Sequence, residues 1–303
     1  MNWKQTLFWS FSAAAIFYYF LLFGVFVFVG QEEMQLFIPE WWYIREFLFQ
    51  PGGFCAVAGQ WIIQYYRQPM SAVVFHTVLL VGCGFMVYRI LRCFSDKTYL
   101  LFLSLLPVLY LVKMSIHGEY LVDGTVGVVL MLLALSVSLK VRRAGSIAGY
   151  GIASTLFLCG LTGLLSVCYA FLYTLLALLR YKTSRQRLAA AACLIPALFI
   201  YLFSGWLGIP VPLSDGWMPE AYLEIQRLPH YYMYRVWTFF TLSIVGVALF
   251  ARFVPVIGEK SKWMDRVALV VCLITALVSI RFCLPEPWHA QRMMLDELSF
   301  LAR

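Results

Sequence analysis

Two adjacent carboxylates, Glu32 and Glu33, form the first pattern in the chain that is suited to chemistry. They follow a long apolar stretch, so we expect them at a membrane surface. Neighbouring carboxylates repel each other, which raises one pKa or recruits a cation. Either residue could be a general base for a hydroxyl group, and Glu33 could hold a divalent cation, Mg²⁺ or Mn²⁺, over a lipid phosphate. Both could equally be solvated charges that end a helix.

A second cluster consists of His117, Glu119 and Asp123. The two carboxylates are four residues apart, so they share one face if a helix begins there. Asp123 starts an apolar stretch and could lie below the membrane surface. A histidine and two carboxylates could bind a metal or pass protons. Acidic residues at a helix start also simply complement the helix dipole.

A third cluster combines Arg227, His230 and Arg235 with three tyrosines between them. Basic groups and aromatic rings at a membrane surface suit a phosphate or a sugar. The same residue types also suit an anchor at the interface between lipid and water.

The composition determines which elements must position these clusters. The chain has 303 residues, of which 62% are hydrophobic and only 13% are charged. A soluble domain averages about half apolar and a quarter charged residues. The composition therefore excludes disorder, a nucleic-acid partner and nearly every soluble fold, and it predicts an all-α bundle of transmembrane helices.

Apolar stretches near spanning length divide the predicted membrane domain, residues 1–284, into nine spans. Residues 146–180 are barely long enough for two crossings, and a glycine-containing break at 160–163 favours a hairpin there. We expect spans at 7–29, 71–93, 98–115, 121–139, 146–162, 164–180, 188–207, 236–256 and 265–283.

The distribution of charge sets the orientation of these spans. With the N-terminus in the cytoplasm, the inner segments carry 15 of the 23 basic residues but only 3 of the 15 acidic ones. This bias follows the positive-inside rule and predicts an outer C-terminus. The excess of basic residues then needs no partner beyond membrane lipids.

Three outer segments, at 30–70, 117–123 and about 208–235, are predicted to be more than linkers. In the first, Pro39 opens a short helix at 40–50, and a second follows at about 54–67 after Pro51-Gly52-Gly53. Their many aromatic residues suit two helices lying flat on the outer leaflet. At the other end of the chain, residues 285–303 resemble an amphipathic helix, and we expect them to begin a further soluble region.

The stretch Arg45–Pro69 (REFLFQPGGFCAVAGQWIIQYYRQP), with Gln31-Glu32 after the first span, resembles a family of uncharacterised bacterial polytopic membrane proteins, a domain of unknown function. The Gln-Pro-Gly-Gly core and the stretch from Gln64 to Pro69 carry most of the match. The resemblance implies the bacterial inner membrane but no activity.

The broader layout is similar to the C-type membrane glycosyltransferases, which carry an acidic motif after the first span and a long first outer loop with helices on the membrane. The resemblance implies sugar transfer from a polyprenyl-phosphate-linked donor by direct displacement at the anomeric carbon. Glu33 would be the base or metal ligand, Glu119 or Asp123 would assist, and Arg227 or His230 would neutralise the leaving phosphate. The family motif usually contains aspartate, whereas residues 30–70 contain none. Two other classes remain open: a transporter of lipid or small solutes, and a non-catalytic membrane scaffold.

Overall fold

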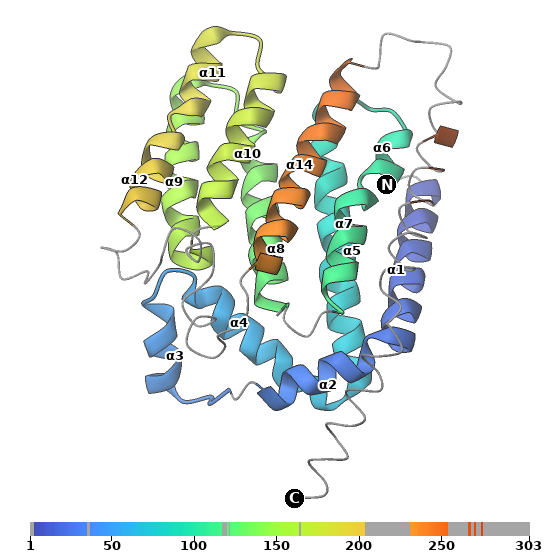
Figure 1. Ribbon diagram of the computed structural model, residues 1–303. Coiled ribbons are helices and arrows are strands. Elements are labelled where there is room, and N and C mark those ends of the chain that lie inside the picture. The colour runs from blue at the N-terminus through green and yellow to red at the C-terminus, as the bar shows by residue number, and fades with distance from the viewer. Residues whose placement is uncertain are drawn as a thin grey trace, which may run out of the picture.

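The computed structural model describes residues 3–34, 37–116, 120, 122–163, 165–203 and 231–253, with the single positions 266, 267, 270 and 274. All regular structure in these residues is helical, which confirms the all-α prediction. The longer helices run side by side as a bundle, and α2, α3 and α4 lie at one end of it (Figure 1).

The described residues form a series of helices. In chain order they are α1 (Trp3–Phe23), α2 (Val25–Met34), α3 (Trp41–Leu48), α4 (Gly53–Ile63), the 3₁₀ helix η1 (Gln64–Arg67), α5 (Pro69–Leu91), α6 (Tyr99–Leu103), α7 (Leu105–Met114), α8 (Val122–Ser138), α9 (Ala144–Thr162), α10 (Leu165–Arg180), α11 (Ser184–Ala191), α12 (Leu194–Leu202) and α14 (Tyr231–Phe253).

The core is built around α5 and α8, which pack against each other. α1 and α7 also contact α5, while α4, α9 and α10 contact α8. Leu80 of α5, Leu132 of α8 and Leu176 of α10 are completely buried in this core. Segments far apart in the sequence therefore share one apolar interior.

The prediction of nine spans is wrong for the residues that the structure describes. By length and composition, four helices there are long and apolar enough to cross a membrane: Gln5–Phe23, Pro69–Leu91, Ala144–Thr162 and Ser184–Leu202. Other predicted spans became shorter apolar helices, such as α8 with 17 residues and α10 with 16. About 20 apolar residues are needed to cross the hydrocarbon core. The ninth predicted span, 265–283, lies almost entirely outside the described residues.

The first predicted span, 7–29, is divided at Gly24. α1 ends at Phe23, and α2 turns across the end of the bundle (Figure 1). A Cβ atom at Gly24 would come within 2.8 Å of the Phe28 ring, so glycine leaves room for that ring beside Phe20. Glu32 and Glu33 consequently belong to a redirected helix instead of following a straight span.

The two short helices of the first outer segment are present close to their predicted bounds, as α3 and as α4 with η1. No residue of α3 is buried. In contrast, seven of the eleven residues of α4 are buried, because α4 packs against α8 and α9. That α3 and α4 lie flat on the outer leaflet stays a prediction, and α4 is in addition packed against the bundle.

The predicted hairpin within 146–180 is confirmed as α9 and α10. Gly163, with φ of +62°, forms the turn between them. This turn packs on the turn between α3 and α4, where Gly52 has φ of +85° and donates its amide hydrogen to the carbonyl of Gly160, at 3.1 Å. Both glycines occupy the left-handed region, which other residues rarely adopt.

The bundle has two chemically different ends. We call the end that contains α2, α3, α4 and the start of α8 the α4 end. We call the opposite end, with the connections 92–98, 140–143 and 181–183, the basic end, because most of the described lysines and arginines lie there. The charge bias of the sequence predicts that the basic end faces the cytoplasm.

Candidate functional site

The best-defined member of the predicted site is Asp123, in the first turn of α8 at the α4 end. Its side chain is only 3% exposed. Gly59 of α4 lies directly against it, since a Cβ atom there would come within 2.7 Å of the Asp123 Cβ and 2.8 Å of its Oδ1. A glycine on one helix thus makes room for a carboxylate on another.

Three side chains that bear weakly acidic groups surround this carboxylate. Burial raises the pKa of the Cys55 thiol, and the negative charge of Asp123 raises it further. Burial also raises the pKa of Tyr66 and of Tyr120, with a smaller contribution of the same sign from Asp123 in each case. All three groups therefore remain protonated and uncharged at neutral pH.

Tyr66 links this region to a completely buried histidine. Its hydroxyl oxygen lies 2.7 Å from Nε2 of His76 on α5. The imidazole is stacked on the Phe28 ring, with 4.3 Å between centroids and 11° between planes. No motif in the sequence gives His76 a role. A histidine inside an apolar helix must find a polar partner, and that requirement is the signal that could have singled it out.

A second set of polar contacts connects α2 to the residues before α8. Gln31 is buried and donates from Nε2 to the carbonyl oxygen of Tyr120, at 2.9 Å. The Tyr120 hydroxyl is hydrogen-bonded to Oγ1 of Thr125, at 3.1 Å. The α4 end is thus a closed polar junction, in which side chains from several helices form hydrogen bonds away from water.

The remaining predicted site residues are placed only in part. Glu32 is half-buried in the last turn of α2, and Glu33 follows it in the same helix. Arg235 lies in the first turns of α14. The side chains of Glu33 and Arg235, and the whole residues His117, Glu119, Arg227 and His230, lie outside what the structure describes.

A metal centre finds no support among the residues that the structure describes. No group of three or more histidine, cysteine, aspartate or glutamate side chains there could hold an ion. The cation predicted at Glu33 stays a prediction, since that side chain and its predicted partners are outside those residues.

The described residues thus define an α-helical protein with four helices that are long and apolar enough to cross a membrane. Residues 1–299 match the Family of unknown function (DUF6057), and the chain belongs to that family. No curated protein and no solved structure matches it.

Proposed function

We propose that this chain is an integral protein of the bacterial inner membrane that transfers a sugar from a polyprenyl-phosphate-linked donor at its α4 end. One observation carries the proposal: Asp123 is a buried carboxylate where α4 and α8 meet. Its charge acts on the buried Tyr66, which is hydrogen-bonded to His76. Charge in an apolar environment is costly, so an ionisable residue there usually has a function.

The proposed reaction is a direct displacement. An acceptor hydroxyl attacks the anomeric carbon of the donor, and the bond between that carbon and the phosphate oxygen breaks. The polyprenyl phosphate leaves with the bonding electron pair, and the acceptor proton passes to a carboxylate. Asp123 is our choice for this base because its surroundings exclude the water that would compete with the acceptor.

Other residues of the predicted site keep supporting roles in this proposal. Glu32 or Glu33 would orient the acceptor, with Glu33 as ligand if a divalent cation takes part, and Glu119 or His117 would assist Asp123. A basic residue would neutralise the leaving phosphate. The candidates are Arg227, His230 and Arg235.

The proposal is tested by donor consumption in liposomes. The purified protein is incubated with decaprenyl-phosphate-linked glucose, mannose or arabinose and a bacterial lipid extract as acceptor, and the released decaprenyl phosphate is measured. We expect Asp123→Asn to lower the rate for the accepted donor by about 100-fold or more, because general bases contribute 10²–10⁴-fold. The matched control is Asp96→Asn, the same chemical change at an exposed position of the basic end.

Two results would refute the proposal. One is that the folded wild-type protein consumes none of these donors. The other is that Asp123→Asn retains the wild-type rate. Unfolding temperature and gel filtration of each variant separate a lost base from a lost fold.

A transporter is the second candidate, and the Tyr66–His76 pair favours it. His76 is a buried polar residue within α5, one of the four long apolar helices. A transporter depends on such residues inside its spans more than on surface carboxylates. The test is movement of a fluorescent lipid phosphate across the liposome membrane. If His76→Gln blocks this movement while Asp123→Asn does not, the transporter becomes the favoured function in place of the sugar transferase.

A further inference from the structure

The middle of the chain has an unusual charge pattern. From Gly124 to Ser214 there is no acidic residue, yet this stretch contains seven basic ones. They are Lys140, Arg142, Arg143, Arg180, Lys182, Arg185 and Arg187. We call them the basic cluster. Because α8 and α10 both end where these residues occur, the fold brings all seven to the basic end.

Three side-chain hydrogen bonds hold this region in place. The Tyr181 hydroxyl donates to the carbonyl of Val141 at 2.6 Å, and Nε2 of Gln186 donates to the carbonyl of Arg142 at 2.7 Å. Nε of Arg187 donates to the carbonyl of Tyr181 at 2.8 Å. The first two bonds join the connection before α9 to residues 181–186, and the third lies within that second segment, so basic residues from both segments are neighbours.

No carboxylate among the described residues neutralises the basic cluster. Within the described part of the chain, none of its members forms an ion pair. Six of the seven side chains are exposed, and Arg180 is half-buried, with an Nη1 atom that is buried without a hydrogen-bond partner among the described residues. Like charges held this close repel one another, and an anion would relieve that repulsion.

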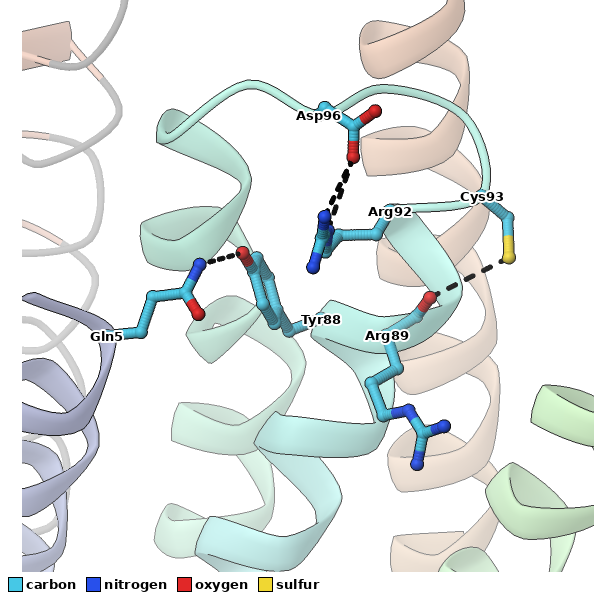
Figure 2. A network of polar contacts seen from close by, with 6 residues as sticks. All are labelled: Gln5, Tyr88, Arg89, Arg92, Cys93 and Asp96. Atoms are coloured by element: carbon cyan, nitrogen blue, oxygen red, sulfur yellow. Dashed lines mark hydrogen bonds and ion pairs between the residues drawn. The ribbon is translucent and has the colours of Figure 1, made fainter. Parts of the chain in front are cut away.

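In another part of the same basic end, an arginine is paired with a carboxylate of the chain. At the end of α5, Arg92 forms an ion pair with Asp96, at 3.1 Å, and Tyr88 beside it accepts a hydrogen bond from Gln5 (Figure 2). The chain thus provides its own carboxylate for one arginine there, whereas no carboxylate in the described ranges pairs with the basic cluster.

An exposed apolar surface continues from the basic cluster. Leu188 is three residues after Arg185 on α11 and is 76% exposed. Ile195 and Leu202 of α12 extend this surface and are 71% and 65% exposed. The cations at one end suit the anionic headgroup of a lipid, and the apolar side chains along the helices suit its acyl chains.

We propose that the basic cluster binds the headgroup of an anionic phospholipid, whose acyl chains lie along the exposed surface of α11 and α12. The phosphate is held by arginines from the two joined connections, since a guanidinium group can form two parallel hydrogen bonds to it. A soluble phosphate would use the same cations but would leave the apolar surface uncovered. The site is independent of the transfer activity proposed for the α4 end.

The test measures stabilisation of the full-length protein in a neutral detergent. Dioleoyl phosphatidylglycerol, dioleoyl phosphatidylcholine and glycerol 3-phosphate are titrated separately, and the unfolding temperature is recorded. A ligand that binds the folded state raises this temperature by mass action. We expect phosphatidylglycerol alone to raise it, and 0.5 M NaCl to reduce the effect.

The variant R142Q/R143Q/R185Q removes three charges whose side chains are not among the hydrogen bonds that join the connections. The variant R89Q/R92Q/K97Q removes three charges from the other part of the basic end. We expect the first variant to bind phosphatidylglycerol about 100-fold more weakly, from the contribution of each basic residue near an anionic lipid. The second should keep wild-type affinity within about threefold.

Three outcomes would overturn the proposal. Equal losses of phosphatidylglycerol affinity in both variants would mean that the lipid responds to the overall positive charge of the basic end and has no specific site. An equal response to glycerol 3-phosphate would mean a site for a soluble anion. An equal response to phosphatidylcholine would mean that the lipid is recognised without its charge.

Discussion

Two aspartates show how differently the two ends of the bundle are built. Asp123, at the α4 end, is 3% exposed and packs against a glycine of another helix. Asp96, at the basic end, has a side chain that is 82% exposed and pairs with an arginine one helical turn before it. At the first position the protein controls the surroundings of a carboxylate, and at the second the solvent does.

The connections between helices also differ between the two ends. At the α4 end, Gly52 and Gly163 bring two backbones together, with a direct hydrogen bond between Gly52 and Gly160. At the basic end, side chains such as Tyr181 and Gln186 reach across to carbonyl oxygens. We therefore expect the stability of the α4 end to depend on side-chain volume, and the stability of the basic end to depend on charge and salt.

The largest effect is expected for Gly53→Ala at the α4 end. A Cβ atom there would lie 1.7 Å from the carbonyl oxygen of Phe47, and backbone cannot move away as a side chain can. We expect the free energy of unfolding to fall by about 3 kcal/mol, measured by thermal unfolding in detergent. The control is Gly145→Ala, where no atom lies within 4 Å of the new methyl group. Equal stability of the two variants would contradict this close approach.

A smaller effect is expected for Gly59→Ala, which tests the contact with Asp123. The added methyl group would come within 2.8 Å of three Asp123 atoms, so the carboxylate must shift. We expect a loss of about 2 kcal/mol in stability. Gly149→Ala places the same group in open space on α9 and should be neutral or slightly stabilising. A stable Gly59→Ala variant would show that α4 and α8 are not closely packed at this point.

The next largest loss of stability is expected for Tyr66→Phe. The change removes the hydroxyl group that is hydrogen-bonded to the buried His76, which leaves a polar atom unsatisfied. We expect a loss of about 1.5 kcal/mol, and a partial recovery in Tyr66→Phe/His76→Phe because both polar groups are then gone. Tyr65→Phe alters the exposed neighbouring residue and serves as the control. If the two single variants unfold at the same temperature, the Tyr66–His76 bond contributes nothing.

The smallest effect is expected at the basic end, for Asp96→Asn. Its ion pair with Arg92 is exposed, and pairs of this kind contribute only about 0.3–0.5 kcal/mol. We expect a change of that size at low salt that disappears in 0.5 M NaCl. A loss above about 1 kcal/mol would mean that the basic end is more ordered than its exposure indicates.

Much of the fold could be predicted from local signals. Pro39 and the Pro51-Gly52-Gly53 break bound α3 and α4 correctly, because proline and glycine limit the backbone directly. The break near Gly163 likewise gave the α9–α10 hairpin. Hydropathy alone could not show that several apolar stretches would be short helices, nor that the first span would turn at Gly24. That turn depends on contacts between the Phe20 and Phe28 rings.

The candidate site was predictable only in part. Asp123 stood out because an acidic residue at the start of an apolar stretch is unusual. Gln31, Tyr66 and His76 did not, since their roles depend on contacts between helices that are distant in sequence. A glutamine, a tyrosine or a histidine has no fixed spacing to a partner on another helix, so no motif marks it.

The hydrogen bond between Gly52 and Gly160 also limits the order in which the protein can be assembled. The first four helices leave the ribosome long before the hairpin that contains Gly160 does. Until that hairpin is inserted, the amide of Gly52 has no carbonyl to bind, and the buried face of α4 lacks its α9 neighbour. The first four helices must therefore wait, incompletely packed, until about a hundred further residues, including Gly160, have been synthesised.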